Sequence, residues 1–281
     1  MQICRTIKDI RTFVAKCKAE GQTVGLVPTM GYFHQGHLSL MREAKKSCHR
    51  VVVSLFVNPL QFGPREDLAQ YPRDFERDSA MAEEVGVDAI FVPPDWEMYP
   101  EGFCTHVEVT GITDKLCGLS RPGHFLGVTT VVAKLFNIVA PDKAFFGQKD
   151  AQQAMVIRRM AADLNMGLEI VVLPIIREED GLAMSSRNVY LDRDQRRNAT
   201  VLYRSLCAFR EAVDRGEKDT ESLRRSITEM IASTPGADID YVEILSVPNL
   251  ESVVLLQGRV MAALAVRFGG TRLIDNIIVE V

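Results

Sequence analysis

The sequence predicts an α/β protein in two parts, a parallel β-sheet wrapped by helices and then a smaller α+β region. Over the first two thirds of the chain, short apolar runs rich in β-branched residues alternate with helical patterns, an order typical of a parallel sheet. Later in the chain, charged amphipathic helices come first and strands follow. The 281 residues are 47% hydrophobic and 25% charged, which is enough apolar material for a substantial core.

Apolar runs in the first part predict the strands of the parallel sheet, with helices between them. The strands are expected at 23–29, 50–58, 89–94, 143–147 and 169–174, with 105–111 as an additional strand. The helices are expected at 37–47, 73–85, 127–139 and 150–164. The third helix contains VTTVVAKLFNIV and is apolar almost all round, so we expect it to pack on the sheet.

The second part begins after about residue 176. Two charged amphipathic segments, DRDQRRNATVLYRSLCAFREAVDRG and DTESLRRSITEMIAS, precede three strand patterns, IDYVEILSV, RVMAALAVRF and TRLIDNIIVEV. We therefore expect one domain at 1–176 and a smaller α+β domain at 177–281. The polar segment REEDGLAMSSRN at the boundary is a hinge, a functional loop, or both.

The charge balance excludes a general affinity for nucleic acid. The formal net charge is −4 and the sequence pI is near 5.8, so an anionic ligand must be held by a local cluster, and a small-molecule partner is expected. The six cysteines form no CxxC pair and are expected to be reduced thiols. The N-terminus lacks an uninterrupted apolar stretch, so we expect a cytoplasmic protein that neither carries a signal peptide nor enters a membrane.

The segment MGYFHQGH (30–37) stands where the first predicted strand gives way to a helix. The free N–H groups of a helix N-terminus attract anions, and the glycines let the backbone come close to a ligand. His34 and His37 can add imidazole donors to phosphate oxygens. The segment therefore indicates a phosphate site.

Other interpretations of this segment remain. Both histidines can be ordinary loop and cap residues. A zinc site is disfavoured because the pattern has no nearby cysteine or carboxylate partner. Neither GxxxxGK[ST] nor GxGxxG occurs at this turn, so it is not a P-loop or a dinucleotide fingerprint.

Two further clusters favour the phosphate site. In FFGQKDAQQ, Gly147 marks another strand-to-helix turn, Lys149 supplies a cation, and Asp150 is placed to cap a helix or bind a ribose hydroxyl. MSSRN adds hydroxyls and Arg187 on an expected mobile loop. Taken alone, Lys149 is an ordinary surface lysine and MSSRN a solvated turn. Together they agree with the rule that open α/β sheets bind ligands at the carboxyl ends of their strands.

These motifs resemble a known family. HxGH with a later serine-rich basic loop resembles the HIGH and KMSKS signatures of the nucleotidyltransferase superfamily that includes class I aminoacyl-tRNA synthetases. Within it, the series PTMGYFHQGH, FVNPLQF, YPR, RPGHFLGVTTVVAKLFNIVAPD, FFGQKDAQQ and DGLAMSSRN, from about 23 to 192, is similar to the pantothenate synthetase (pantoate:β-alanine ligase) family. The resemblance implies a Rossmann-like nucleotidyltransferase domain that binds ATP and pantoate. Because MSSRN lies between the two domains, the C-terminal domain is expected to cover the active site.

The resemblance also implies a reaction. Pantoate attacks the α-phosphate of ATP to give pantoyl adenylate and pyrophosphate, and β-alanine then displaces AMP to give pantothenate. ATP is a substrate, Mg²⁺ is expected to bridge its phosphates, and a homodimer is expected. The expected small-molecule partners are D-pantoate, β-alanine and ATP.

Roles follow for particular residues. The expected catalytic donors are His34, His37, Lys149, Ser185, Ser186 and Arg187, with His37 the proton donor to phosphate. The expected ATP site comprises Met30, Gly31, Tyr32, Phe33, His34, Gln35, Gly36, His37, Gly147, Gln148, Lys149, Asp150, Ile176, Met184, Ser185, Ser186 and Arg187. Gln61, Gln153 and Asn58 are expected at the pantoate and β-alanine sites, and Gln61 borders both.

Some features leave alternatives open. Gln148 replaces an acid that the family often has, which changes only a local charge balance. Arg121 and His124 belong to the family pattern and either contact the substrate or frame its entrance. A different adenylyltransferase of the superfamily, or a catalytically silent nucleotide-binding protein on the same fold, remains a rival to the ligase. The paired glutamines favour a neutral polyol acid as substrate, and the retained His34, His37, Lys149 and Arg187 argue against a silent protein.

Overall fold

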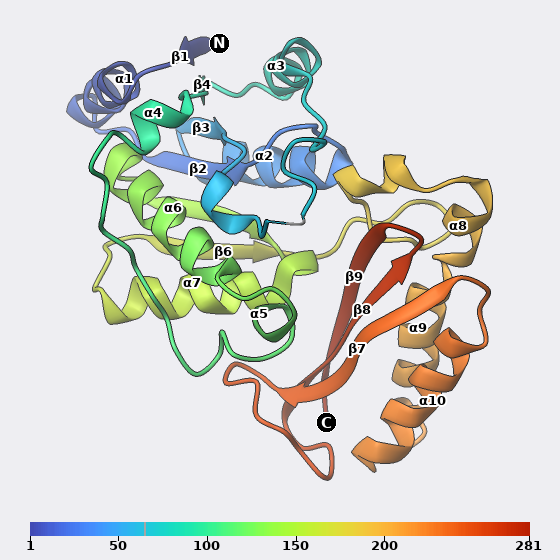
Figure 1. The fold of residues 1–281 in the computed structure, drawn as a ribbon. Coiled ribbons are helices and arrows are strands. Elements are labelled where there is room, and N and C mark those ends of the chain that lie inside the picture. The colour runs from blue at the N-terminus through green and yellow to red at the C-terminus, as the bar shows by residue number, and fades with distance from the viewer. Residues whose placement is uncertain (65) are drawn as a thin grey trace. The chain divides into compact units, whose positions relative to one another are not determined.

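The computed structural model describes residues 1–64 and 66–281, and the chain divides into two compact units (Figure 1). Unit 1 comprises Met1–Gln148 and Gln152–Pro174, and unit 2 comprises Lys149–Ala151 and Ile175–Val281. The short piece 149–151 thus groups with the C-terminal part of the chain although unit 1 surrounds it in sequence.

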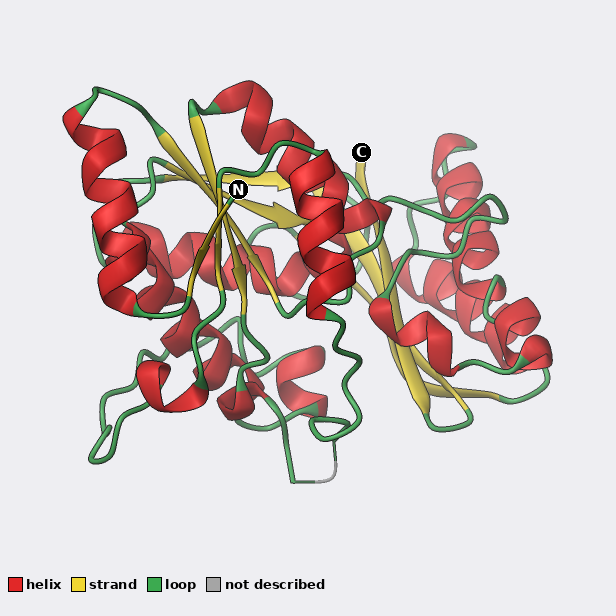
Figure 2. Ribbon diagram, turned by 90° about the horizontal axis from the view of Figure 1, so that it is seen from above, coloured by secondary structure: helices red, strands yellow, loops and turns green. Residues whose placement is uncertain are grey.

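Unit 1 is built on a six-stranded sheet in which every strand pair is parallel. Its strand order is β1-β4-β3-β2-β5-β6. The strands are β1 (Gln2–Cys4), β2 (Val24–Thr29), β3 (Arg50–Leu55), β4 (Ala89–Phe91), β5 (Lys143–Gly147) and β6 (Glu169–Leu173). Parallel strands need crossover connections, and helices supply them on both sides of the sheet (Figure 2).

Helices and short 3₁₀ turns connect these strands. The α-helices are α1 (Ile7–Ala19), α2 (Gln35–Ser47), α3 (Phe75–Glu84), α4 (Asp95–Met98), α5 (Cys117–Ser120), α6 (His124–Val139) and α7 (Ala151–Asp163). The 3₁₀ turns are η1 (Pro59–Gln61) and η2 (Gln148–Asp150). Helix α1 contacts α6 and β2, whereas α2 contacts β2, β3, β5 and α3.

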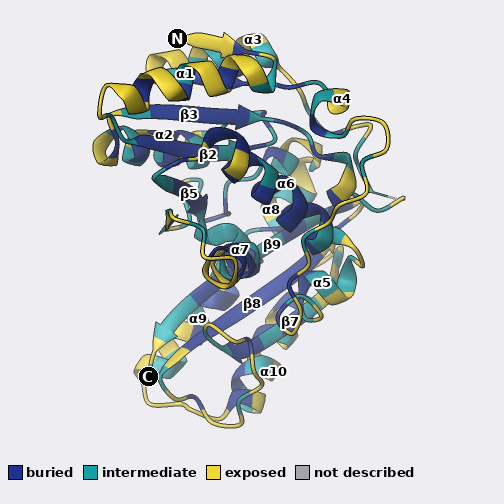
Figure 3. Ribbon diagram, turned by 90° about the vertical axis from the view of Figure 1, so that its left-hand side faces the viewer, coloured by how far each residue is buried: buried dark blue, intermediate teal, exposed yellow. Residues whose placement is uncertain are grey.

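The core of unit 1 lies along the central strands. Strands β2 and β3 are buried, while the outer side of α1 is exposed (Figure 3). On the α2 face, Val27, Val53 and Phe145 pack against Leu38 and Met41. Helix α6 is buried nearly all round, as its apolar sequence predicts, because it is enclosed by sheet, helix and loop.

The prediction of a strand at 105–111 is wrong, because the structure has no strand there. The backbone N–H of Val107 donates to Thr130 Oγ1 at 3.1 Å, and its carbonyl accepts from Thr129 Oγ1. Helix α6 therefore supplies the partners that a neighbouring strand normally supplies. The five main strands and four helices are confirmed, with some ends shifted, whereas the short strand β1 was not predicted.

Unit 2 contains an antiparallel sheet and charged amphipathic helices, as predicted. Strands β7 (Ala237–Ser246), β8 (Arg259–Phe268) and β9 (Thr271–Glu280) pair in the order β7-β8-β9. The helices are η3 (Ser186–Tyr190), α8 (Arg193–Asn198), α9 (Val201–Asp214) and α10 (Thr220–Ala232). Leu206, Ile227 and Leu264 belong to one buried cluster between helices and sheet. The predicted α/β class with a smaller α+β part is confirmed.

Within the described part of the chain, no helix is both long enough and apolar enough to span a bilayer.

Candidate active site

The order of strands in unit 1 reverses at β2. From β2 the chain moves outward to β3 and β4, whereas β5 and β6 lie on the opposite side of β2. The segments that follow β2 and β5 therefore leave the same edge of the sheet in different directions, which is where open α/β sheets bind ligands. Thr29 ends β2 and Gly147 ends β5, so the two predicted clusters begin at this edge.

His34 and His37 form the N-terminal cap of α2. His34 is the N-cap residue, and its Nδ1 accepts the Gly36 N–H at 3.1 Å. The backbone N–H of His34 donates in turn to His37 Nδ1 at 3.3 Å. The two rings lie 4.1 Å apart between centroids. This reciprocal arrangement is a capping box in which imidazoles replace the usual hydroxyl and carboxylate.

The cap fixes the tautomer of each histidine. A ring nitrogen that accepts a hydrogen bond carries no proton, so each neutral imidazole holds its proton on Nε2. Both Nε2–H groups are therefore donors beside the N-terminus of α2. Such a set of donors suits an anionic ligand such as a phosphate.

Asp78 on α3 supports the turn that precedes the histidines. Its carboxylate accepts the backbone N–H groups of Tyr32 at 2.6 Å and Phe33 at 2.7 Å. Gly31 and Tyr32 have φ values of 90° and 53°, a left-handed conformation that Tyr adopts only when its surroundings enforce it. Burial raises the pKa of Asp78, against the opposing effect of these backbone hydrogen bonds. Sequence reasoning missed this residue.

Arg77 braces the same turn from α3. Its guanidinium donates to the Phe33 carbonyl at 2.8 Å and lies over the Tyr32 ring, 4.9 Å from the centroid. Asp78 thus binds the backbone N–H of Phe33, and Arg77 binds its carbonyl.

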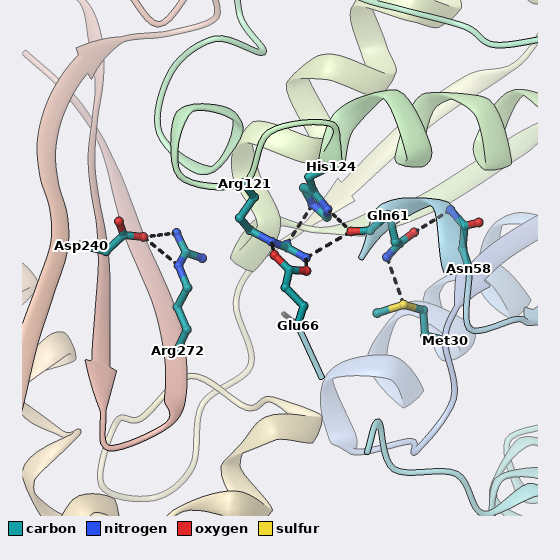
Figure 4. A network of polar contacts seen from close by, with 8 residues as sticks. All are labelled: Met30, Asn58, Gln61, Glu66, Arg121, His124, Asp240 and Arg272. Atoms are coloured by element: carbon teal, nitrogen blue, oxygen red, sulfur yellow. Dashed lines mark hydrogen bonds and ion pairs between the residues drawn. The ribbon is translucent and has the colours of Figure 1, made fainter. Parts of the chain in front are cut away.

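Asn58 and Gln61 form a buried amide pair (Figure 4). Asn58 Nδ2 donates to Gln61 Oε1 at 3.2 Å and to the Gly127 carbonyl at 3.0 Å. Asn58 Oδ1 accepts the Tyr99 hydroxyl at 2.7 Å, and burial raises the pKa of that phenol. Gln61 Nε2 lies 3.0 Å from Met30 Sδ. The structure therefore brings together three predicted residues, Met30, Asn58 and Gln61.

Arg121 and His124 contact the backbone of Gln61. The Gln61 carbonyl accepts from His124 Nδ1 at 2.8 Å and from Arg121 at 3.3 Å. Arg121 also forms a two-pronged ion pair with Glu66, at 2.7 and 2.6 Å (Figure 4). These groups fix the position of η1, which carries Gln61.

The two glutamines at the start of α7 differ in their surroundings. Gln152 is buried, and its amide bonds the Cys117 N–H, the Ile112 carbonyl and the Lys115 carbonyl. Gln153 is half-buried, and in the part of the chain that the structure describes no hydrogen bond joins it to Gln61. Gln152 therefore has a structural role, whereas the predicted substrate residue is Gln153.

Lys149 and Asp150 belong to unit 2. Lys149 Nζ lies 3.8 Å from Asp150 Oδ2. The side chain of Asn276 on β9 donates to the Lys149 carbonyl at 3.1 Å. The last strand of the chain thereby holds the backbone of the predicted lysine.

A buried ion pair lies next to Asn276. Asp275 accepts two hydrogen bonds from Arg177, at 2.6 and 3.0 Å, and Arg177 stacks on the Tyr203 ring at 4.1 Å. Burial raises the pKa of Asp275, and the guanidinium opposes this effect. Because Arg177 follows Ile176 in the chain, this pair anchors the segment that carries the predicted adenine contact.

The segment 176–187 folds back on itself within unit 2. The Met184 N–H donates to the Ile176 carbonyl at 3.0 Å. Ser185 caps η3, because its hydroxyl accepts the Arg187 N–H at 3.3 Å. Ser186 is buried. The last three residues of MSSRN therefore begin a 3₁₀ helix that Ser185 caps, whereas the sequence suggested a loop.

Among the described residues, no group of three His, Cys, Asp or Glu side chains is placed to hold a metal ion.

A parallel sheet with a histidine-capped helix after its central strand defines the class of this protein, an α/β nucleotide-binding fold of the HxGH type. A family model described as Pantoate-beta-alanine ligase matches residues 2–278. The chain belongs to this family, which confirms the expected resemblance.

Relatives of this family match the chain along its whole length. A pantothenate synthetase from Pelotomaculum thermopropionicum is 62% identical over 278 residues, or 99% of each chain. The crystal structure of a pantothenate synthetase from Thermus thermophilus has a TM-score of 0.94 at 46% identity and covers 99% of both chains. A pantoate-beta-alanine ligase from Francisella tularensis, complexed with beta-gamma ATP and beta-alanine, has a TM-score of 0.81 at 33% identity and covers 99% of this chain and 97% of that one.

Proposed function

We propose that the chain condenses D-pantoate with β-alanine in an ATP-dependent reaction that gives pantothenate, AMP and pyrophosphate through pantoyl adenylate. Membership of the ligase family supports this reaction. The Francisella relative, whose complex contains beta-gamma ATP and beta-alanine, supports the two smaller substrates. The observation that carries the proposal is the histidine cap of α2, in which the Nδ1 atoms of both rings accept backbone N–H groups.

The first step needs positioning rather than a strong base. The pantoate carboxylate is ionised at neutral pH, so its oxygen attacks the α-phosphate directly while the bond to the pyrophosphate oxygen breaks. Negative charge then gathers on the phosphate oxygens. The cap holds both rings in place, and the Nε2–H groups of His34 and His37 stabilise that charge.

The second step is acyl transfer. The neutral amine of β-alanine attacks the acyl carbon of the adenylate, a C–N bond forms, and the C–O bond to AMP breaks. The amine loses a proton in this step, and AMP departs as a stable phosphate anion. The family's C–N bond formation is this step.

We assign the remaining predicted residues to the same reaction. Gln61 and Gln153 bind the hydroxyls and carboxylate of pantoate, since amides both donate and accept, and Asn58 supports this pocket by holding the Gln61 amide. Lys149, Ser185, Ser186 and Arg187 neutralise the departing pyrophosphate. Met30 to His37, Gly147 to Asp150, Ile176 and Met184 line the ATP site. The hydrogen bonds that fix Asn58 and Gln61 support the first assignment.

Magnesium is proposed to enter bound to ATP. Mg²⁺ keeps several waters and usually needs only one or two carboxylates besides the substrate phosphates. That requirement fits the described residues, which offer no cage of three acidic or imidazole ligands. Asp150, half exposed next to Lys149, is the carboxylate available in the proposed site. The ion would offset the negative charge of the phosphates.

We further propose a domain at 1–176 that binds ATP and pantoate and a domain at 177–281 that closes over them. If so, ATP and pantoate together reduce the radius of gyration measured by small-angle X-ray scattering. Identical profiles with and without ligands would contradict the closure.

The oligomeric state and the location in the cell complete the proposal. A homodimer is expected from the family and is tested by light scattering. A cytoplasmic location is proposed from the composition of the chain, and fractionation of the native host tests it.

The decisive experiment follows AMP, ADP and pantothenate together. The purified protein is incubated with Mg²⁺, ATP, D-pantoate and β-alanine, and products are quantified by mass spectrometry. Equal amounts of AMP and pantothenate establish the ligase. AMP retained in the product would instead identify another adenylyltransferase, and unchanged ATP would favour a silent nucleotide-binding protein.

A further inference from the structure

The ion pair between Arg121 and Glu66 is the starting point. Arg121 Nε donates to Glu66 Oε1 at 2.7 Å, and a terminal nitrogen donates to Oε2 at 2.6 Å. This is the two-pronged geometry in which a guanidinium recognises a carboxylate best. The two side chains are 16% and 26% exposed, so each partner remains open to exchange with solvent.

The pair is attached directly to Gln61. Arg121 donates to the Gln61 carbonyl at 3.3 Å and to His124 Nε2 at 3.1 Å, while His124 Nδ1 donates to the same carbonyl at 2.8 Å. His124 is therefore the tautomer that carries its proton on Nδ1. A carboxylate held on Arg121 would therefore lie beside the backbone of Gln61. The proposed function assigns Gln61 to pantoate, and the family resemblance places it at the border of the β-alanine site.

The chemistry of Glu66 matches that of one substrate. The end of a glutamate side chain is a carboxylate on two methylene groups, and β-alanine is the same unit with an ammonium group at its other end. Burial raises the pKa of Glu66, but hydrogen bonds from Arg121 outweigh this effect and the net pKa is lowered. Glu66 is therefore ionised at neutral pH, as the substrate carboxylate is.

We propose that Arg121 is the binding group for the carboxylate of β-alanine, and that Glu66 occupies its place until the substrate arrives. This inference rests on the proposed function. The exchange replaces one two-pronged ion pair by another, so Arg121 is never left without a carboxylate. Held in this way, β-alanine presents its amine at the end that must attack the adenylate.

Opposite substitutions in this one pair test the proposal. Glu66→Gln weakens the internal competitor, so the KM for β-alanine should fall roughly two- to fivefold, the worth of a partly exposed ion pair. Arg121→Ala removes the binding group, so the KM for β-alanine should rise on the order of tenfold or more. The KM for ATP in the same assays is the internal reference and should change less.

A matched control lies in the same unit. Lys143 and Glu169 form a surface ion pair at 2.8 Å, and Glu169→Gln should leave both KM values unchanged. Should the Glu66→Gln and Arg121→Ala variants both raise the KM for β-alanine, the pair is structural and the proposal is wrong. If Glu66→Gln leaves the KM for β-alanine unchanged, the proposal is also wrong.

A substrate analogue distinguishes a binding role of Arg121 from a merely structural one, because only a binding role affects the preference for an amine that carries a carboxylate. n-Propylamine keeps the amine and lacks the carboxylate, so wild-type protein should strongly prefer β-alanine, and Arg121→Lys, which cannot form the two-pronged pair, should reduce that preference. An undiminished preference overturns the proposal even if Arg121→Ala fails to fold. Pyrophosphate release from ATP and pantoate without β-alanine tests the proposed function separately, since it requires no β-alanine site.

Discussion

At the scale of single residues, the histidines combine a structural and a chemical role. The Nδ1 atom of each ring accepts a backbone N–H of the cap, and the Nε2–H can donate to a ligand. A carboxylate cap would also hold the helix but carries no donor, and the single O–H of a serine or threonine cap stays close to the backbone, so neither extends a donor as far as an imidazole does. This accounts for histidine at both positions.

His37→Ala should slow adenylate formation on the order of a hundredfold, by analogy with the loss of one donor to a transition-state oxyanion. Single-turnover ATP cleavage with pantoate measures it, and an unchanged rate would remove His37 from the proposed role. His37→Gln keeps an acceptor for the His34 N–H and should restore stability but not the full rate. His49→Ala, which changes a histidine paired with Thr23, is the matched control.

Asp78→Ala should destabilise the protein by about 2–4 kcal/mol, because two backbone donors at Tyr32 and Phe33 lose their acceptor. The displaced turn should also raise the KM for ATP. Urea unfolding and steady-state kinetics measure these effects. Asp74→Ala removes the N-cap of the same helix without touching the turn, so it should cost about 1 kcal/mol and leave the KM unchanged. Equal kinetic effects in both variants would refute a specific role of Asp78 in holding the turn.

At the scale of elements, a close approach of α6 to η1 positions Gln61. A Cβ added at Gly127 would lie 2.2 Å from the Leu60 carbonyl oxygen and 2.6 Å from the Gln61 nitrogen. Only glycine lets the helix come this near, and the same residue accepts a hydrogen bond from Asn58. The position of the Asn58 and Gln61 side-chain amides therefore depends on Gly127 of α6 having no side chain.

Gly127→Ala should push η1 away, lower the free energy of unfolding by about 1–3 kcal/mol, and raise the KM for pantoate. Gly167→Ala is the control, because a Cβ there meets nothing within 4 Å, and its effect should stay within about 0.5 kcal/mol. If Gly127→Ala binds pantoate normally, the approach of α6 does not position Gln61.

The sequence was informative about elements and less so about what supports them. Hydrophobic periodicity predicted the main strands, and HxGH drew attention to the cap of α2. Asp78 could not be predicted, because an acid within an amphipathic helix looks the same whether it faces solvent or two backbone N–H groups. The error at 105–111 has a similar origin. An extended segment alternates in the same way whether its backbone bonds a strand or, as at Val107, the threonines of a helix.

At the scale of the whole molecule, Asp88 links helix α2 to strand β3. It accepts from Lys45 at 2.7 Å, Arg50 at 2.9 Å and the Val51 N–H at 2.8 Å. Burial raises the pKa of Asp88, but these hydrogen bonds outweigh it and the net pKa is lowered. A carboxylate with a lowered pKa in the folded state stabilises that state above its unfolded pKa, and the stabilisation disappears as the pH falls.

Asp88→Asn should therefore cost about 1–3 kcal/mol at pH 6, and the difference from wild type should shrink as the pH falls below about 4. Urea unfolding of both proteins between pH 3 and pH 6 measures it. A difference that stays constant with pH would show that the charge of Asp88 does not matter.

The contact between Asn276 and the Lys149 carbonyl spans 127 positions of the chain. A ribosome therefore makes the lysine turn long before it makes the strand that secures it. Because domains tend to fold as units during synthesis, the first unit can form while this turn still lacks its anchor. Until the final strand emerges, a nascent chain has its histidine cap but an unsecured lysine turn, so any early binding of nucleotide would have to rely on only part of the proposed site.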